Sequence, residues 1–98
     1  MLETNLEKRC VAHVRKLGGK AYKWVCPGSV GVPDRICIFP GGKILFLELK
    51  RPGRKNGLSP QQVKVQRLLT VLGCNVLTTN DFEEFKGFLA ERFGINEV

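Results

Sequence analysis

The spacing of apolar residues along the chain predicts an alternation of helices and strands. Leu6, Cys10 and Val14 recur every four residues, which places them on one side of a helix. Short apolar runs bounded by glycine and proline, such as residues 43–50 (KILFLELK), are typical of strands. We therefore expect helices over residues 2–17, 59–72 and 81–93, and strands over residues 21–26, 34–39, 43–50 and 74–79.

The resulting order, α-β-β-β-α-β-α, predicts an α/β sandwich with a central mixed sheet flanked by helices. Residues 1–98 are expected to form one domain, because two domains would leave neither with a workable core. Pro40-Gly41-Gly42 is a hairpin-type turn, so the second and third strands should be antiparallel. The preceding stretch, residues 27–33 (PGSVGVP), is too interrupted for a strand and is expected to be a loop.

The second and third helices carry clear start signals and inner faces. Ser59 followed by Pro60 and, three residues after the serine, Gln62 predicts a capping box at the start of the second helix. The expected inner faces are Val65, Leu68, Leu69 and Leu72 for the second helix and Phe82, Phe85 and Leu89 for the third.

Composition excludes several classes of protein. Hydrophobic residues make up 43% of the chain, which is enough for a core, yet no apolar run approaches the roughly 18 residues of a membrane span. The charged first nine residues do not resemble a signal peptide, so a soluble, cytoplasmic protein is expected. The four cysteines contain no C-x-x-C pair and should be free thiols rather than zinc ligands or disulfides: Cys10, Cys26, Cys37 and Cys74.

The charge favours a polyanionic partner. The chain has 16 Lys and Arg against nine Asp and Glu, a net charge of +7. Only four of the acids precede residue 81, so the greater part of the chain is strongly basic. Such a surface suits a nucleic-acid backbone, although a basic surface that serves only solubility has the same composition.

Two of these four acids should meet across the hairpin. Asp34 and Glu48 each lie seven residues from Gly41, so an antiparallel pairing centred there makes them cross-strand neighbours. Adjacent carboxylates are destabilising unless a cation bridges them or one is protonated. Two carboxylates with room for water suit Mg²⁺ or Mn²⁺, which we take as the expected cofactor, with no organic cofactor.

Lys50 falls on the same strand face as Glu48, two residues further on. Its ammonium group could orient an attacking water and stabilise negative charge on a phosphate. The alternative is a plain Glu–Lys pair in which the two side chains only neutralise each other. His13, the single histidine, is interpreted as a surface residue, and the proposed chemistry needs no histidine.

Polar residues on inner helix faces provide further candidates. Glu3 and Glu7 both fall within the apolar stripe of the first helix, where at least one is expected to serve the metal site. Acids at a helix start also stabilise the helix dipole, which is the alternative explanation. Gln62 could act as a capping residue, as a polar contact to the site, or as both.

The combined motifs resemble a known nuclease family. GVPDR (residues 31–35), FLELKRPG (residues 46–53) and LSPQQ (residues 58–62) resemble the PD-(D/E)xK superfamily and, within it, a stand-alone VRR-NUC domain of the phage or bacterial kind. The likeness covers nearly the whole chain. It implies a restriction-endonuclease-like fold and hydrolysis of phosphodiester bonds that leaves a 5′-phosphate.

The resemblance also implies roles for individual residues. Asp34, Glu48 and the backbone carbonyl of Leu49 would bind the metal ion, and Lys50 would position the attacking water. Glu7 would act through metal-bound water, with Glu3 as its rival for that role. Gln62 matches the glutamine of the family and completes the expected catalytic set.

Small members of this family are similar to Holliday junction resolvases, which implies a homodimer acting on branched DNA. A dimer would also offer two sites and a broader basic face. The expected phosphate contacts are Lys20, Lys23, Arg51, Arg54 and Lys55. The alternatives are a non-catalytic nucleic-acid-binding module, a nuclease acting on flaps, nicks or plain duplex, and a phosphatase acting on small esters.

Overall fold

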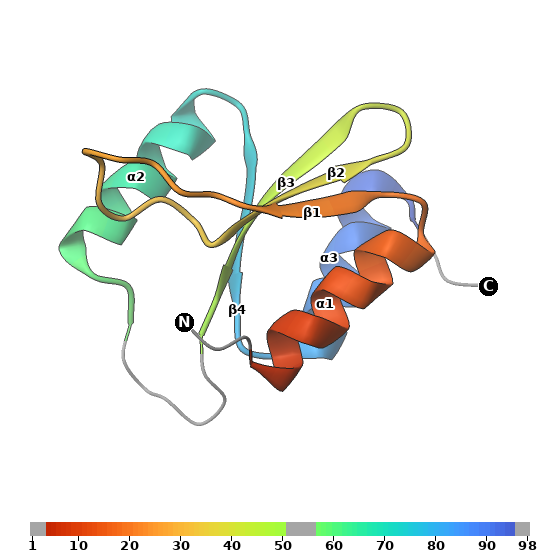
Figure 1. The fold of residues 1–98 in the computed structure, drawn as a ribbon. Helices are drawn as coiled ribbons and strands as arrows, with labels where there is room; N and C mark the ends of the chain where they lie inside the picture. Colours follow the sequence, from red (N-terminus) through yellow and green to blue (C-terminus); the bar gives the residue numbers. More distant parts are fainter. Residues whose placement is uncertain (1–3, 51–56, 96–98) are drawn as a thin grey trace.

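A computed structural model describes residues 4–50 and 57–95 and shows three helices and four strands within them (Figure 1). Their order is the predicted α-β-β-β-α-β-α. The elements are α1 (Asn5–Lys16), β1 (Lys20–Lys23), β2 (Arg35–Phe39), β3 (Lys43–Leu49), α2 (Pro60–Val71), β4 (Asn75–Thr79) and α3 (Phe82–Phe93). Four of the predicted residues, Glu3, Arg51, Arg54 and Lys55, lie outside the described residues.

The four strands form one mixed sheet in the order β1-β2-β3-β4. β2 is antiparallel to both of its neighbours, β1 and β3, and β4 runs parallel to β3. In the β2–β3 hairpin Ile38 pairs with Ile44 and Arg35 pairs with Leu47, a register centred on Gly41 as predicted. Continued by one residue, this register sets Asp34 opposite Glu48.

The hydrophobic core lies between the sheet and the two helices α1 and α3, which cover the same face (Figure 1). It consists of Leu6, Cys10, Val14, Cys37, Phe39, Leu45, Leu47, Phe85 and Leu89. The prediction that His13 lies on the surface is wrong. Its ring is 8% exposed and makes edge contacts with Phe82 and Phe85 of α3.

The opposite face of the sheet is covered by α2, less completely than predicted (Figure 1). The capping box at Ser59 and Gln62 is present. The predicted inner face is wrong in part, because Leu68 and Leu72 are 58% and 68% exposed. On the sheet, Ile44 is 40% exposed, so this side of β3 is only partly covered.

The four cysteines are free thiols, as predicted. Cys10 and Cys37 are buried in the core, and burial raises the pKa of each thiol to about 12. They are therefore inert packing residues. Among the described residues no helix is long and apolar enough to cross a membrane.

Candidate active site

Asp34 stands immediately before β2, where the sheet opens into the glycine-rich loop. Its backbone carbonyl accepts a hydrogen bond from Trp24 N, 3.0 Å away, which extends the pairing of β1 and β2 by one residue. Its side chain turns to β3, where Oδ2 accepts a hydrogen bond from Leu49 N at 2.9 Å. The carboxylate is thus held against the end of β3, beside Glu48.

Glu48 is the most buried acid of the site, with only 4% of the residue exposed. Its Oε2 accepts a hydrogen bond from Gln62 Nε2 at 2.9 Å, and Lys50 Nζ lies 3.7 Å from the same oxygen. The second oxygen, Oε1, is buried and meets no hydrogen-bond donor among the described residues. A plain pair with Lys50 therefore leaves half of this carboxylate unsatisfied.

The electrostatics of the two carboxyl groups reflect this arrangement. Burial, followed by the negative charge of Asp34, raises the pKa of Glu48 to about 7, and the contacts with Lys50 and Gln62 offset only part of that rise. The pKa of Asp34 is also raised, chiefly because the carboxyl is partly buried, although the residue as a whole is exposed. Two neighbouring acids whose ionised forms are disfavoured are typical of a site built for a cation.

Gln62 connects Glu48 and Lys50 through its single amide group. Its Oε1 accepts hydrogen bonds from Ser59 N at 2.9 Å and Lys50 Nζ at 3.1 Å. Because that oxygen faces two donors, the amide nitrogen must face Glu48. The capping and site roles predicted for Gln62 therefore occur together, and the capping box sets the orientation of the amide.

The loop before Asp34 packs directly against the start of α2. Gly31 has a φ of +96°, and a Cβ added there would lie 2.6 Å from the carbonyl carbon of Gln61 and 2.9 Å from Gln62 N. Only glycine fits both this backbone conformation and this close approach. The loop thereby helps to hold Gln62 at the level of Glu48.

Glu7 reaches the same region from α1 and is tied to the sheet by Arg35. Arg35 Nε lies 2.8 Å from Glu7 Oε2, and its guanidinium also donates to the carbonyl of Ala21 at 3.3 Å. The arginine is 6% exposed, on the core side of β2. Glu7 is thus held at the edge of the site, and its charge contributes to the raised pKa of Asp34.

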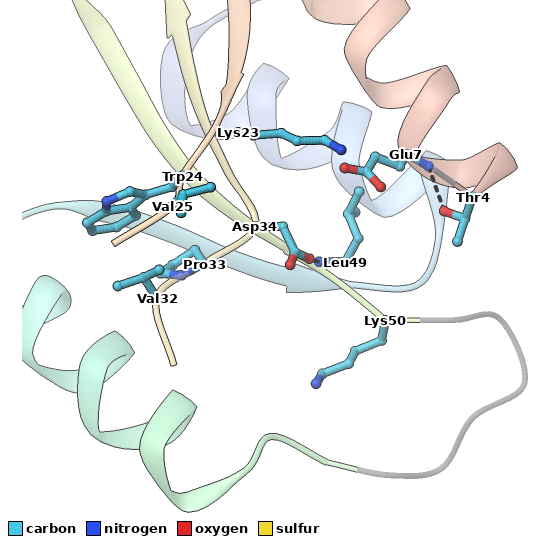
Figure 2. A pocket seen from close by; sticks show the side chains of 10 residues that line it. All are labelled: Thr4, Glu7, Lys23, Trp24, Val25, Val32, Pro33, Asp34, Leu49 and Lys50. Atoms are coloured by element: carbon cyan, nitrogen blue, oxygen red, sulfur yellow. Dashed lines mark hydrogen bonds between the residues drawn. The ribbon is translucent and has the colours of Figure 1, made fainter. Parts of the chain in front are cut away.

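A pocket of about 400 Å³ opens over these residues (Figure 2). Trp24, Val25 and Val32 lie to one side of Asp34 in this view, and Glu7 and Leu49 lie to the other. The remaining lining residues are Thr4, Lys23, Pro33 and Lys50. Glu48 and Gln62 do not line the pocket, but each contacts Lys50, which does.

The chain is 48% identical over 75 residues to the curated "Putative nuclease p44" of Acyrthosiphon pisum secondary endosymbiont phage 1, a match that covers 76% of this chain and 78% of that protein. No family model matches the sequence. A solved structure described as "VRR_NUC domain" matches with a TM-score of 0.78 and 25% identity, covering 86% of this chain and 89% of that one. The chain belongs to the VRR-NUC nuclease family.

As a VRR-NUC protein the chain is a nuclease, a hydrolase whose substrate is nucleic acid. The chain also has the α/β, restriction-endonuclease-like fold expected of that family. Asp34, Glu48 and Lys50, two acids and a lysine, stand together at one end of the sheet.

The carboxylates of Asp34 and Glu48 suit the binding of a divalent metal ion. Among the described residues no group of three or more His, Cys, Asp or Glu side chains is arranged to hold a metal. Mg²⁺, however, is commonly bound through one or two carboxylates and keeps several waters. The buried, unsatisfied Oε1 of Glu48 beside Asp34 matches that requirement.

Of the residues predicted to contact phosphate, Lys23 is the one that the structure places in the pocket among those it describes. Lys20 instead pairs with Ile38 at the other end of β1 and lies beside the ring of Tyr22. Arg51, Arg54 and Lys55 belong to the undescribed segment 51–56.

Sequence reasoning missed two residues of this site, Arg35 and Trp24. Arg35 alternates with the apolar Cys37 and Phe39, so an inward-facing arginine in need of an acid could have been recognised from the strand pattern. Nothing in the sequence indicated that Trp24 lines the pocket. The residue was expected inside a strand over residues 21–26, but β1 ends at Lys23.

Proposed function

We propose that this protein is a divalent-metal-dependent DNA endonuclease with Asp34, Glu48 and Lys50 at its centre. The observation that carries the proposal is the buried Oε1 of Glu48, which meets no donor among the described residues while Asp34 adds a second negative charge. A buried carboxylate oxygen without a partner is costly unless a cation completes it.

Asp34, Glu48 and the backbone carbonyl of Leu49 would hold Mg²⁺ or Mn²⁺. Bound there, the ion would supply Lewis-acid stabilisation of negative charge on the phosphate. Lys50 provides a positive charge on the pocket side of Glu48, where it orients the attacking water and stabilises the phosphate oxygens. The reaction is hydrolysis of a phosphodiester bond that leaves a 5′-phosphate.

The neighbouring residues keep this arrangement in place. Gln62 holds Glu48 Oε2 and Lys50 Nζ with one amide group, so that the carboxylate and the ammonium group keep a constant spacing. Glu7 stands at the edge of the pocket, where it would act through metal-bound water near Asp34.

Branched DNA, in the manner of a Holliday junction resolvase, is the substrate we propose. The net charge of +7 supports DNA binding, and Lys23 lies in the pocket itself. We place the activity in the cytoplasm of a bacterial or phage-infected cell, which the phage relative supports.

A homodimer is part of the same proposal. Exposed apolar side chains on α2 support it, since Leu68, Val71 and Leu72 are 58%, 77% and 68% exposed. Light scattering after gel filtration should give twice the mass of the chain for the wild type. Leu68→Glu combined with Val71→Glu should give the single mass, whereas Thr70→Glu on a neighbouring side of the helix should leave the dimer intact. A single mass for the wild type would overturn the dimer.

The catalytic proposal is tested on a panel of labelled DNA structures: a four-way junction, a flap, a nicked duplex and a plain duplex. The wild type should cut the junction best with Mg²⁺ or Mn²⁺ and cut nothing in EDTA. Glu48→Ala should still bind DNA in gel shifts but cut none of the substrates. Cleavage that survives in this variant would remove Glu48 from the active site, and binding without cleavage by the wild type would favour a non-catalytic module.

A further inference from the structure

The pocket has two walls of opposite character. Asp34, Lys50 and Glu7 form the polar wall, which the proposed phosphodiester chemistry uses. The other wall is apolar and consists of Trp24, Val25, Val32 and Pro33. Figure 2 shows the side chains of this wall on the side of Asp34 away from Glu7. Hydrolysis of a phosphodiester bond does not by itself require an apolar wall.

Trp24 is fixed on the apolar wall by contacts of its backbone and of its ring. Its backbone N donates to the carbonyl of Asp34 at 3.0 Å, which pairs the two residues across the end of the β1–β2 ladder. Its ring packs on Phe46 of β3, with 5.2 Å between ring centroids. Phe46 and Glu48 share one face of β3, so the indole of Trp24 and the carboxylate of Glu48 lie on the same side of the sheet. The residue is half-buried, and part of it lines the pocket.

The loop that follows Trp24 exposes further apolar surface. Val25 is 80% exposed and Val30 is 76% exposed, on either side of a Pro-Gly turn. Exposed apolar side chains grouped beside a polar site are typical of ligand-binding surfaces. Lys23 also lines the pocket and adds a positive charge on the side of Glu7 (Figure 2).

Resting on the proposed function, we propose that the apolar wall receives a nucleobase adjacent to the scissile phosphate, stacked on Trp24. A nucleotide has the two parts that the pocket requires: an anionic phosphate for the polar wall and Lys23, and a flat apolar base for the other wall. Indole rings stack bases of any type, because every base has a π-face. A base within a continuous duplex is stacked on both sides and must leave the helix to reach the wall.

This placement explains how a backbone-cutting enzyme would select DNA structure. Unpaired bases, and bases at a branch point, leave the stack at little cost, whereas fully paired bases do so at a high cost. Trp24 then acts as a specificity-determining residue that favours interrupted duplexes over continuous ones. Base sequence would matter little.

Trp24 is the only tryptophan of the chain, so its fluorescence reports directly on stacking. The probes are three short DNA duplexes that differ at one position: a single unpaired thymine, an abasic site in place of that thymine, and full pairing. Titrations are made in EDTA, so that no cleavage occurs. The unpaired thymine should quench the fluorescence strongly, and the abasic and paired duplexes should quench it weakly. Equal quenching by all three duplexes would overturn the proposal.

A variant provides the second measurement. Trp24→Leu keeps an apolar side chain against Phe46 but lacks a ring to stack on. Its affinity for the duplex with the unpaired thymine, measured by fluorescence anisotropy of labelled DNA, should fall roughly tenfold or more. Its affinity for the fully paired duplex should not change. Tyr22→Ala is the matched control, because Tyr22 is an exposed aromatic residue two positions before Trp24 that does not line the pocket.

Failure of the proposed base site can be distinguished from failure of the catalytic proposal. If Glu48→Ala still cuts DNA while the unpaired base quenches Trp24, the assignment of the acids fails and the base site stands. If Glu48→Ala is inactive but Trp24→Leu binds all three duplexes as the wild type does, the base site fails and the catalytic assignment stands.

Discussion

Gln62 Nε2 donates a hydrogen bond to Glu48 Oε2 across 2.9 Å, so the first turn of α2 contacts the buried carboxylate of β3 directly. The same amide closes the capping box of α2 through Ser59 N. The stability of a helix start and the geometry of the active site therefore depend on a single side chain.

Gln62→Ala should lower the DNA cleavage rate by roughly 10- to 100-fold, because a hydrogen bond to a charged group contributes about 1.5–3 kcal/mol. The rate is measured under single-turnover conditions at saturating metal. Gln61→Ala is the matched control, since Gln61 is the exposed neighbour in the same turn. Equal rates for the two variants would show that the amide does not support the site.

Gly31→Ala should impair the enzyme much more than Gly28→Ala. Both glycines have positive φ, +96° and +80°, so both substitutions carry a conformational cost of about 1–2 kcal/mol. Only at Gly31 would the new Cβ also collide with the backbone of Gln61 and Gln62. Urea unfolding and cleavage rates should both separate the two variants, and similar values for the pair would contradict the packing of this loop on α2.

Arg35→Met should destabilise the fold by about 3 kcal/mol, because it leaves Glu7 without its guanidinium partner in a largely buried position. The free energy of unfolding is measured with urea. Glu83→Gln serves as the control, since Glu83 pairs with Lys86 on the surface while 71% exposed, and its loss should change stability by less than about 0.5 kcal/mol. Equal effects of the two substitutions would mean that the Arg35–Glu7 pair contributes no more than a surface pair.

The metal-free protein should lose stability as the pH rises from about 4.5 to 7. The pKa of Glu48 in the folded protein is about 7, above its ordinary value, so between these pH values the folded state binds more protons than the unfolded state. Ionisation of Glu48 then destabilises the fold, and the loss is complete above pH 7. Glu48→Gln should flatten this dependence and be more stable than the wild type at pH 8 in EDTA. Parallel stability curves for the two proteins would contradict the raised pKa.

The centre of the site could be predicted from the sequence because it depends on local symmetry. A hairpin with a fixed turn sets its own register, so the equal distances of Asp34 and Glu48 from Gly41 were sufficient to bring them together. The capping box was equally local, since Ser59 and Gln62 belong to one helical turn.

The errors came from contacts between distant segments. His13 is buried because α3, about 70 residues later, covers it with Phe82 and Phe85. The face of α2 was misjudged because two polar residues turn inward, Gln62 to Glu48 and Gln66 to Thr78. Apolar periodicity alone cannot identify a helix face that is held by hydrogen bonds.

The most direct test of the account is a Mn²⁺ titration of the protein at pH 8, in which unbound Mn²⁺ is followed by electron paramagnetic resonance. The wild type should bind Mn²⁺, and Asp34→Asn and Glu48→Gln should each bind it at least tenfold more weakly, whereas Glu84→Gln on the exposed start of α3 should match the wild type. If Glu48→Gln bound Mn²⁺ as tightly as the wild type does, Glu48 would not be a ligand of the metal.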